Sequence, residues 1–417
     1  MLQFIKVKGD CVGCTACMAS CPIHCIKMVE DEEGFLYPVA SNACINCGKC
    51  ERVCPIQNPP IVKMEQKQKA YAALSKNNDV WKRSASGGAF TEICRLWEDE
   101  NTLFVGAAWD GLKVHHVGVI GFDAINPLCK SKYVASSIGN TFVEIKNHLI
   151  TGHKALFCGT PCQVAGLKKY LGKDYENLFL IDLICHGVGS PKVFQACMDY
   201  MSKQFGSKII GYEFRTKHRN HGLNNFGRFS IKDNKCISVE KDPYIQLFLS
   251  QLCLRPSCGK NCQFRAENRH GDITIADFKG LADIFPEFTG FPKNYSTIIA
   301  NTKKGHELVN RLNTIMNMKE CSLDDIKKHN PLFYRQTYFS EERDDFMSQF
   351  VEKPEETIER NTTYFDTGRY GIKRYIWNHI PWSLRKIVLR FLNKWGEVEP
   401  DHSSCNESLL IFDKEYR

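Results

Sequence analysis

Eight cysteines near the start of the chain repeat one spacing twice, and no other feature constrains the fold as strongly. Residues 11–22 read CVGCTACMASCP, and residues 44–55 read CINCGKCERVCP. In both runs two, two and three residues separate successive cysteines, and a proline follows the fourth. Thiolates at this spacing wrap a cubane iron–sulfur cluster. The stretch therefore predicts two [4Fe–4S] clusters.

The ligands are expected to cross between the two runs. In two-cluster ferredoxins the fourth cysteine of each run binds the cluster of the other run. The expected ligand sets are Cys11, Cys14, Cys17 and Cys54 for one cluster, and Cys44, Cys47, Cys50 and Cys21 for the other. Cys25 lies outside the pattern and is expected to be a small buried thiol. Residues 26–30 and 34–38 predict two short strands around an acidic turn.

Zinc sites and disulfides are the alternatives to clusters. Zinc sites use paired Cys-x2-Cys motifs and require neither the third cysteine nor the Cys-Pro ending, while disulfides need an oxidising compartment. The N-terminus lacks the apolar core of a secretory signal, and no run approaches the ~18 apolar residues of a membrane span. With 21 cysteines, the sequence predicts metal ligation in a reducing cytoplasm.

The length of 417 residues predicts about three domains, and a hydrophobic content of 43% is enough for sizeable cores. A net charge of +8 suits an anionic cofactor or an acidic partner, and no nucleic-acid-binding module is recognisable. The expected fold is an α+β and α/β multidomain protein. It comprises a bacterial-type dicluster ferredoxin domain at 1–58, an α/β region with parts at 70–150 and 151–320, and a helical extension and tail at 321–417.

Three turns of the α/β region precede predicted helices. Ser86-Gly87-Gly88 precedes a helical pattern at 91–97, and Thr160 and Pro161 fit the N-cap and N1 of a helix at 164–171. Ser190 and Pro191 fit the same positions before 192–201. Free N–H groups at helix starts favour an anion, although an ordinary turn is the simpler interpretation of Ser86–Gly88. The predicted strands are 71–74, 103–109, 114–120, 155–158, 178–185, 272–277 and 296–301.

The later part of the chain offers weaker signals. Arg215 and Lys217 lie in a basic loop that either grips phosphates or is a solvated hairpin end. Beyond about Leu308 the sequence predicts polar helices. The segment 381–395 is an amphipathic helix that docks on a partner, on an anionic membrane surface or on its own core. Five further cysteines are either buried thiols or the source of four ligands for a third cluster: Cys158, Cys162, Cys185, Cys258 and Cys262.

Five segments in order after the cysteine-rich stretch resemble the beta-subunit family of coenzyme F420 hydrogenases and dehydrogenases, in its form with a fused ferredoxin. They are Ser86–Gly88, Gly159–Gln163, Asp182–Gly187, Arg255–Cys258 and Asp272–Phe278. The resemblance covers about residues 8–305. It implies a non-covalently bound FAD near a cluster and, in archaeal relatives, hydride transfer between FAD and the deazaflavin F420. Bacterial relatives often accompany surface-polysaccharide genes.

The resemblance also implies roles for individual residues. His186 and Lys132 are the expected catalytic residues, with His186 donating to the isoalloxazine or moving a proton. Tyr133 is expected to face the flavin or substrate, and Asp277 to bind ribityl or ribose hydroxyls. The remaining FAD contacts are expected from Ser86, Gly87, Gly88, Thr160, Pro161 and Gln163. The simpler alternatives are a structural role for His186 and a loop cap for Asp277.

Three function classes follow. The first is an FAD-dependent iron–sulfur oxidoreductase, with F420, a related carrier or an intermediate of polysaccharide synthesis as substrate. The second is an electron-transfer subunit that relays electrons to a separate catalytic protein, and the third is a zinc-binding scaffold without redox chemistry. The expected partner is a redox protein or a small electron donor or acceptor, and a homo-oligomer is a further expectation.

Overall fold

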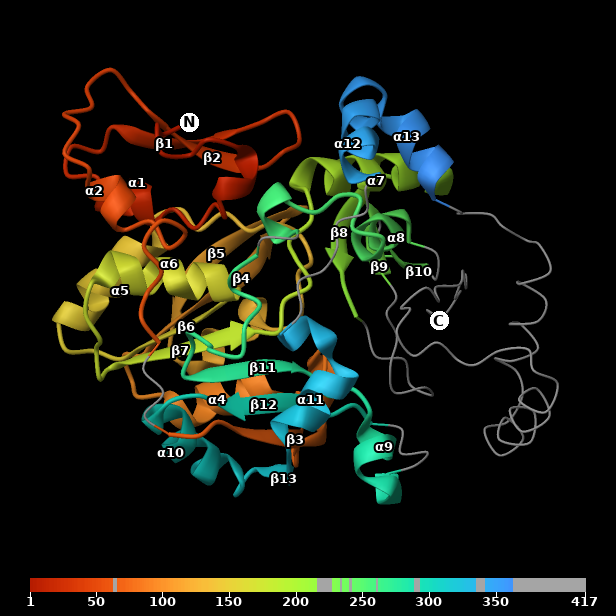
Figure 1. The fold of residues 1–417 in the computed structure, drawn as a ribbon. Helices are drawn as coiled ribbons and strands as arrows, with labels where there is room; N and C mark the ends of the chain where they lie inside the picture. The colour runs from red at the N-terminus through yellow and green to blue at the C-terminus, as the bar shows by residue number, and fades with distance from the viewer. Residues whose placement is uncertain are drawn as a thin grey trace.

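A mixed sheet lies at the centre of the computed structural model (Figure 1). The structure describes residues 1–62, 66–215, 227–232, 235–239, 242–259, 262–288, 293–334 and 342–362. Within them the strand order is β13-β3-β12-β11-β7-β6-β4-β5, with β4, β6, β7 and β11 parallel. The strands are Lys69–Ser75 (β3), Leu103–Asp110 (β4), Lys113–Ile120 (β5), Ala155–Gly159 (β6), Leu178–Leu183 (β7), Ile273–Asp277 (β11), Ser296–Ala300 (β12) and Met316–Cys321 (β13).

Helices cover both faces of this sheet and make it the middle of three layers. Alternate residues of a strand point to opposite faces. Leu156 and Phe179 pack with α4 (Ala89–Trp97) and α10 (Lys303–Leu312), whereas Phe157 and Leu180 pack with α5 (Thr141–Ile150) and α6 (Pro161–Leu171). Burial on both faces explains why β6 is apolar throughout and why β7 is apolar except for Asp182. All seven predicted strands of the α/β region are confirmed within a few residues at each end.

The prediction of helix beyond Leu308 is wrong at one element. Residues Met316–Cys321 form β13, which pairs antiparallel with β3 at the edge of the sheet. Its polar sequence has little strand character by itself, and pairing with a neighbouring strand overrides that preference. The predicted parts 70–150 and 151–320 both contribute strands to this one sheet.

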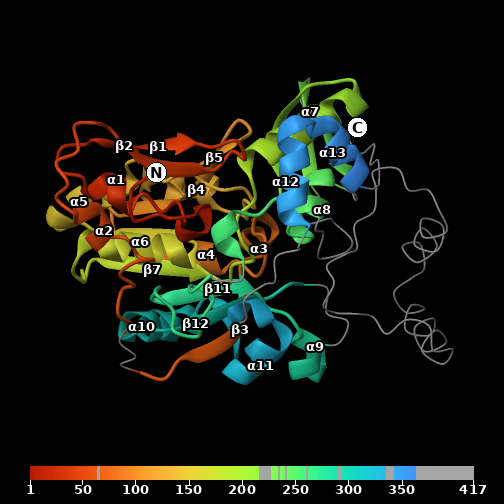
Figure 2. The same ribbon diagram turned by 45° about the horizontal axis from the view of Figure 1, so that its top comes forward.

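The cysteine-rich segment forms a small domain over α5 and α6 (Figures 1 and 2). It contains α1 (Ala16–Ser20), α2 (Lys49–Arg52) and the antiparallel hairpin of β1 (Ile26–Glu30) and β2 (Leu36–Ala40). The two predicted short strands are confirmed. Gly48, at φ 68°, precedes α2 in a left-handed conformation that a residue without Cβ adopts most easily.

A third part of the molecule was not foreseen from the sequence. It is a three-stranded antiparallel sheet of β8 (Ile209–Glu213), β9 (Gly227–Ile231) and β10 (Lys235–Val239). An aromatic core that includes Phe194 and Tyr244 joins it to four helices. They are α7 (Pro191–Phe205), α8 (Pro243–Leu249), α12 (Arg343–Glu352) and α13 (Pro354–Asn361).

The remaining elements are short. The α-helices are α3 (Asn78–Arg83), α9 (Leu281–Ile284) and α11 (Leu323–His329), and the 3-10 helices are η1 (Lys8–Asp10), η2 (Phe122–Ala124), η3 (Asn126–Leu128), η5 (Pro256–Cys258), η6 (Pro286–Phe288) and η7 (Pro331–Phe333). Lys217 and the amphipathic segment 381–395 lie outside the described residues. None of the helices described has the length and apolar character that a membrane crossing requires.

Candidate functional site

The structure brings together the four cysteines predicted for the first cluster, here called the inner set: Cys11, Cys14, Cys17 and Cys54. Burial raises the pKa of the Cys14 thiol, and the neighbouring thiols of the other three raise it further. Cys11 and Cys14 are both buried. Cys54 comes from the second run, so the chain crosses between the runs as the two-cluster pattern requires.

The second predicted group, here called the outer set, is Cys44, Cys47, Cys50 and Cys21. Burial raises the pKa of Cys50, and the Cys44 and Cys47 thiols add to it. Cys47 is exposed. The Cys21 sulfur lies 3.5 Å from the Cys25 sulfur, and Cys25 also contacts Cys44. Cys25 is buried as expected, but its place between two members of the outer set was not visible in the spacing.

A cavity of about 440 Å³ lies between the cysteine-rich domain and the sheet domain. Four thiols, here called the third set, line it: Cys162, Cys185, Cys258 and Cys262. Burial raises the pKa of Cys162, and the other three thiols raise it further. Burial together with Cys185 and Cys262 raises the pKa of Cys258 to about 12. Each of the four is therefore a neighbour of the others, although they come from three separate segments of the chain.

The fifth candidate, Cys158, is not part of this group. Burial raises its pKa to about 12, and its charged or titratable neighbours are Lys132, Asp182 and Cys129. In the described parts of the chain, no three His, Cys, Asp or Glu side chains converge closely enough to hold one metal ion. A cubane spreads its thiolates over four irons, whereas a zinc ion needs them within about 2.3 Å of one centre.

Helix α6 joins the inner set to the third set. Cys162 lies in its first turn, and Gly166 follows one turn later. A Cβ placed on Gly166 would lie 2.7 Å from the Cβ of Cys14 and 2.8 Å from its sulfur. The two thiol sets thus lie against successive turns of one helix, and only a glycine leaves room for Cys14.

A second group of polar residues gathers where the parallel strands end. Lys132 donates from Nζ to the carbonyl oxygens of Cys129 at 2.6 Å and Pro127 at 2.9 Å. Burial lowers its pKa to about 8. Arg215, which is 8% exposed, pairs with Asp277 and donates to the Tyr133 hydroxyl at 3.3 Å.

Phe248 connects this group to His186. The ring centroid of Phe248 lies 5.1 Å from that of Tyr133 and 5.0 Å from that of His186. Nε2 of His186 lies 3.3 Å from the Phe248 carbonyl oxygen. Burial lowers the pKa of His186 to about 4, so the imidazole is neutral at pH 7 and, as the donor in this contact, offers Nδ1 as an acceptor.

The Ser86–Gly88 turn lies beside Asp277 but is already occupied by protein contacts. Ser86 donates from Oγ to the Tyr295 carbonyl oxygen, and the Gly87 amide donates to Oγ of Ser296, both at 2.8 Å. Ser296 pairs with Asp277 across the β11–β12 ladder. A Cβ on Gly87 would lie 2.2 Å from the Ala73 carbonyl oxygen. Close packing therefore explains why residue 87 is a glycine. Phosphate binding at this turn stays a prediction.

The predicted N-terminus of α6 is confirmed, and it faces the thiols. Thr160 is the N-cap and Pro161 the first residue of the helix. The Thr160 amide donates to Oε1 of Gln163 at 2.8 Å, and the Thr160 hydroxyl lies 3.1 Å from the Cys162 sulfur. Thr160, Pro161 and Gln163 line the thiol cavity, whereas Tyr133 and Asp277 are not among the residues that line it.

Two arginines near these groups had been given no role from the sequence. Arg265 donates from Nε to the Cys185 carbonyl oxygen at 3.1 Å and also bonds the His186 carbonyl. Arg265 thus holds the backbone of Cys185 and His186, which connects the thiol cavity to the His186 ring. Arg255 bonds Cys11 of the inner set. The available signal in the sequence was the position of the two arginines, which flank Cys258 and Cys262.

The comparisons with known proteins agree with this layout. Residues 10–59 match a 4Fe-4S dicluster domain, and residues 152–327 match the C terminus of the coenzyme F420 hydrogenase/dehydrogenase beta subunit. No curated protein matches the chain. A chain of the F420-reducing [NiFe] hydrogenase complex from Methanosarcina barkeri is 14% identical with a TM-score of 0.42, over 72% of this chain and 94% of that chain. The two family matches thus identify residues 10–59 as a 4Fe-4S dicluster domain and residues 152–327 as similar to the C terminus of the coenzyme F420 hydrogenase/dehydrogenase beta subunit.

Proposed function

We propose that the chain is an iron–sulfur flavoprotein subunit with three [4Fe–4S] clusters and one FAD, which passes electrons between a redox partner and a small acceptor such as F420. The observation that carries this proposal is the third set. Cys162, Cys185 and the pair Cys258 and Cys262 come from three separate segments of the chain and line one cavity, and no ordinary packing requirement gathers four thiols in one place. Their neighbours at the cavity wall include the ends of β7 and the start of α6.

The thiol sets lie in an order that suits electron transfer. A cubane supplies one-electron chemistry at a potential set by its hydrogen bonds and exposure. Cys47 of the outer set is exposed, Cys14 of the inner set is buried against Gly166, and Cys162 lies one helical turn away. These contacts define a path through the chain from the surface to the cavity.

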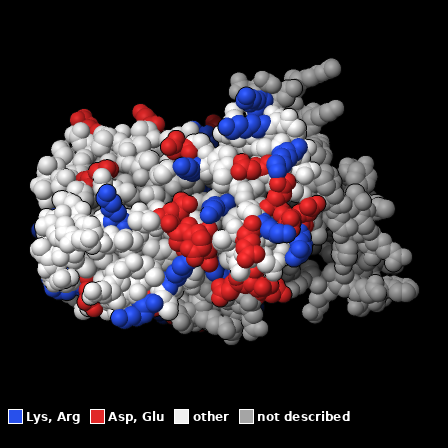
Figure 3. Space-filling view, turned by 90° about the horizontal axis from the view of Figure 1, so that it is seen from above, with Lys and Arg blue, Asp and Glu red and all other residues white. Residues whose placement is uncertain are grey.

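The surface near the outer set suits a protein partner. Ile45, between Cys44 and Cys47, is 62% exposed, and Ile23 is 41% exposed. Figure 3 shows few charged side chains over the cysteine-rich domain, whereas acidic and basic side chains gather over the α12 and α13 side. Apolar side chains at the surface favour contact with another protein, so this face is the proposed entry or exit for electrons.

The polar residues at the ends of the parallel strands include Lys132, Tyr133 and Arg215, whose hydrogen-bond donors fit a flavin. Nε of Arg215 is buried without a partner among the described residues, which leaves a donor free for a ligand oxygen. Lys132 adds a half-buried cation, and Tyr133 an aromatic face. When bound, a flavin supplies the exchange between one-electron and two-electron transfer. Phe248 contacts both Tyr133 and His186, and His186 follows Cys185 of the third set. A flavin held by Arg215, Lys132 and Tyr133 would therefore approach the third set from the His186 side.

The test is to count iron, sulfide and flavin per chain after anaerobic purification. We expect about twelve irons, four for each cubane, and one FAD. Cys258→Ser is expected to lower the iron count to about eight, because it removes one thiolate of the third set. The matched control is Cys158→Ser, a buried thiol outside that set, which is expected to keep about twelve.

Each other result rules out part of the proposal. About eight irons in the unchanged chain would show that the third set holds no cluster. Twelve irons without flavin, even after FAD is added, would leave an electron relay that depends on a separate catalytic protein. Zinc in place of iron would rule out the redox function.

A further inference from the structure

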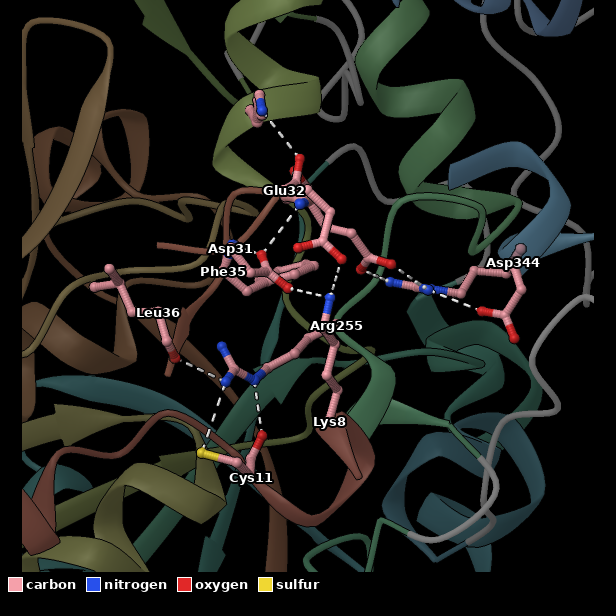
Figure 4. A network of polar contacts seen from close by, with 12 residues as sticks. Lys8, Cys11, Asp31, Glu32, Phe35, Leu36, Arg255 and Asp344 are labelled. Atoms are coloured by element: carbon pink, nitrogen blue, oxygen red, sulfur yellow. Dashed lines mark hydrogen bonds and ion pairs between the residues drawn. The ribbon is translucent and has the colours of Figure 1, made fainter. Parts of the chain in front are cut away.

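The guanidinium of Arg255 lies between the inner set and the thiol cavity (Figure 4). It is the first residue of the Arg255-Pro-Ser-Cys258 segment, so it belongs to the sheet domain and stands three residues before a member of the third set. Its side chain nevertheless points into the cysteine-rich domain, where it is 3% exposed. A cation removed from water in this way has to be held by its surroundings.

The backbone of Arg255 bonds Val188 of its own domain, but its side chain bonds the cysteine-rich domain. Nε donates to the Cys11 carbonyl oxygen at 2.9 Å, and Nη2 donates to the Leu36 carbonyl oxygen at 2.9 Å. Nη2 also lies 3.8 Å from the Cys11 sulfur. The guanidinium carbon is 4.4 Å from the ring centroid of Tyr37. A Cβ on Gly13 would lie 2.9 Å from Nη1, so the chain beside Cys11 leaves room for this one side chain.

These contacts place a buried positive charge and an N–H donor against one thiolate of the inner set. Reduction adds an electron to a cluster and makes its environment more negative, so nearby cations and hydrogen bonds to sulfur favour the reduced state. Low dielectric strengthens this effect relative to the same charge in water. Cys14 packs directly on α6 of the sheet domain, whereas Arg255 is the cation through which that domain acts on Cys11.

We propose that Arg255 is a positioning residue that raises the reduction potential of the inner cluster, so that electrons collect on the inner set next to α6 and the cavity. This inference rests on the proposed function, because it requires a cluster on Cys11, Cys14, Cys17 and Cys54. The ferredoxin domain by itself lacks this cation. Its fusion to the sheet domain therefore changes the chemistry of the cluster as well as its location.

The experiment is a redox titration of the full chain followed by electron paramagnetic resonance, in the unchanged protein and in Arg255→Met. One of the titrating steps is expected to move to a potential that is lower by at least about 59 mV. For a one-electron step this corresponds to a tenfold change in the equilibrium constant of reduction. The other steps stay in place. Arg255→Gln also lacks the charge and is expected to give the same shift if Arg255→Met does not fold. Arg255→Lys keeps the positive charge, and its reduction potential is expected to lie close to that of the unchanged protein.

The matched control is Arg343→Gln. Arg343 is also buried, also comes from outside the cysteine-rich domain and also bonds it, through Glu33. Its other side-chain bonds go to the Leu254 carbonyl oxygen and Asp344, whereas those of Arg255 reach Cys11. If Arg343→Gln moves the same step equally, loosened docking explains the shift and the proposal is wrong. An unchanged potential in Arg255→Met and Arg255→Gln would overturn it as well. Absence of iron in the unchanged protein would instead refute the proposed function, and the iron count shows this before any titration.

Discussion

Burial lowers the pKa of both His116 and Lys132, and the type of side chain decides which of them is charged at pH 7. His116 is 6% exposed, stacks on Phe157 at 5.4 Å between ring centroids and lies 2.8 Å from the Ser136 hydroxyl through Nδ1. Burial lowers its pKa to about 4. By contrast, Lys132 stays largely protonated at pH 7, because its lowered pKa is still about 8. The same physical cause thus keeps one side chain neutral and leaves the other charged.

The pH dependence of stability should report the state of His116. The unfolded chain binds a proton on this histidine below about pH 6.5, whereas the folded chain does so only near pH 4, so stability falls as the pH falls from 6.5 towards 4. Between pH 7.5 and 5.5 the loss from this group is about 1 kcal/mol. His116→Gln is expected to lose less over that interval in urea unfolding. Replacing the exposed His153 in the same way should change nothing, and an equal effect from both would contradict the assignment.

Among the elements, α6 has the most functions. Its N-terminus is capped within the thiol cavity, its first turn carries Cys162, and its buried face contributes Val164 and Leu167 to the core under the cysteine-rich domain. Gly166 lets α1 approach closely enough for Cys14 to touch the helix. Glycine in a helix interior costs about 1 kcal/mol relative to alanine, so the close approach is maintained at a cost in helix stability.

Gly166→Ala should therefore destabilise the protein despite the higher helix propensity of alanine. The new methyl group would collide with Cys14, and overpacking of this kind costs about 1–3 kcal/mol. We expect a lower melting temperature and iron loss from the inner set. The control is Gly106→Ala on β4, where the nearest side-chain atom to the new Cβ is 3.6 Å away. A Gly166→Ala protein with unchanged iron and higher melting temperature would show that α1 and α6 are not in this contact.

At the scale of the whole molecule, the cysteine-rich domain is held by contacts from both other parts. The acidic turn between β1 and β2 reaches α7, where Ser190 donates to the Glu33 carbonyl oxygen and Lys192 to that of Glu32. The Glu33 carboxylate pairs with Arg343 of α12, and their side chains are 13% and 4% exposed. Together with Arg255, these bonds fix the distance between the inner set and the cavity.

Removing the Glu33 carboxylate should open this docking contact. Glu33→Ala leaves Arg343 buried without its main partner, and breaking a buried pair in this way costs about 3–5 kcal/mol. We expect the low end of that range, because Asp344 still contacts Arg343 at 2.9 Å. Hydrogen exchange in residues 30–36 should accelerate. Lys203→Gln breaks the exposed pair with Glu355 and serves as the control, since such pairs contribute less than about 1 kcal/mol. Equal acceleration in both would argue against the docking role.

The sequence by itself determined the local features of this protein. Cysteine spacing specified the dicluster domain, because the ligands of a cubane are mostly neighbours in the chain. Apolar runs and N-cap residues such as Thr160 and Ser190 specified the strands and helix starts, since these depend on short-range geometry. The order of the motifs was enough to indicate the family of residues 152–327.

Only the tertiary structure decided which distant residues meet. It separated Cys158 from Cys162, Cys185, Cys258 and Cys262, and it placed Arg255 against Cys11, 244 residues apart in the chain. It also turned the polar segment Met316–Cys321 into a strand, by pairing it with β3. The spacing of residues along the chain does not predict these long-range contacts. They depend on the order of the strands in the sheet and on which loops lie together at its edge.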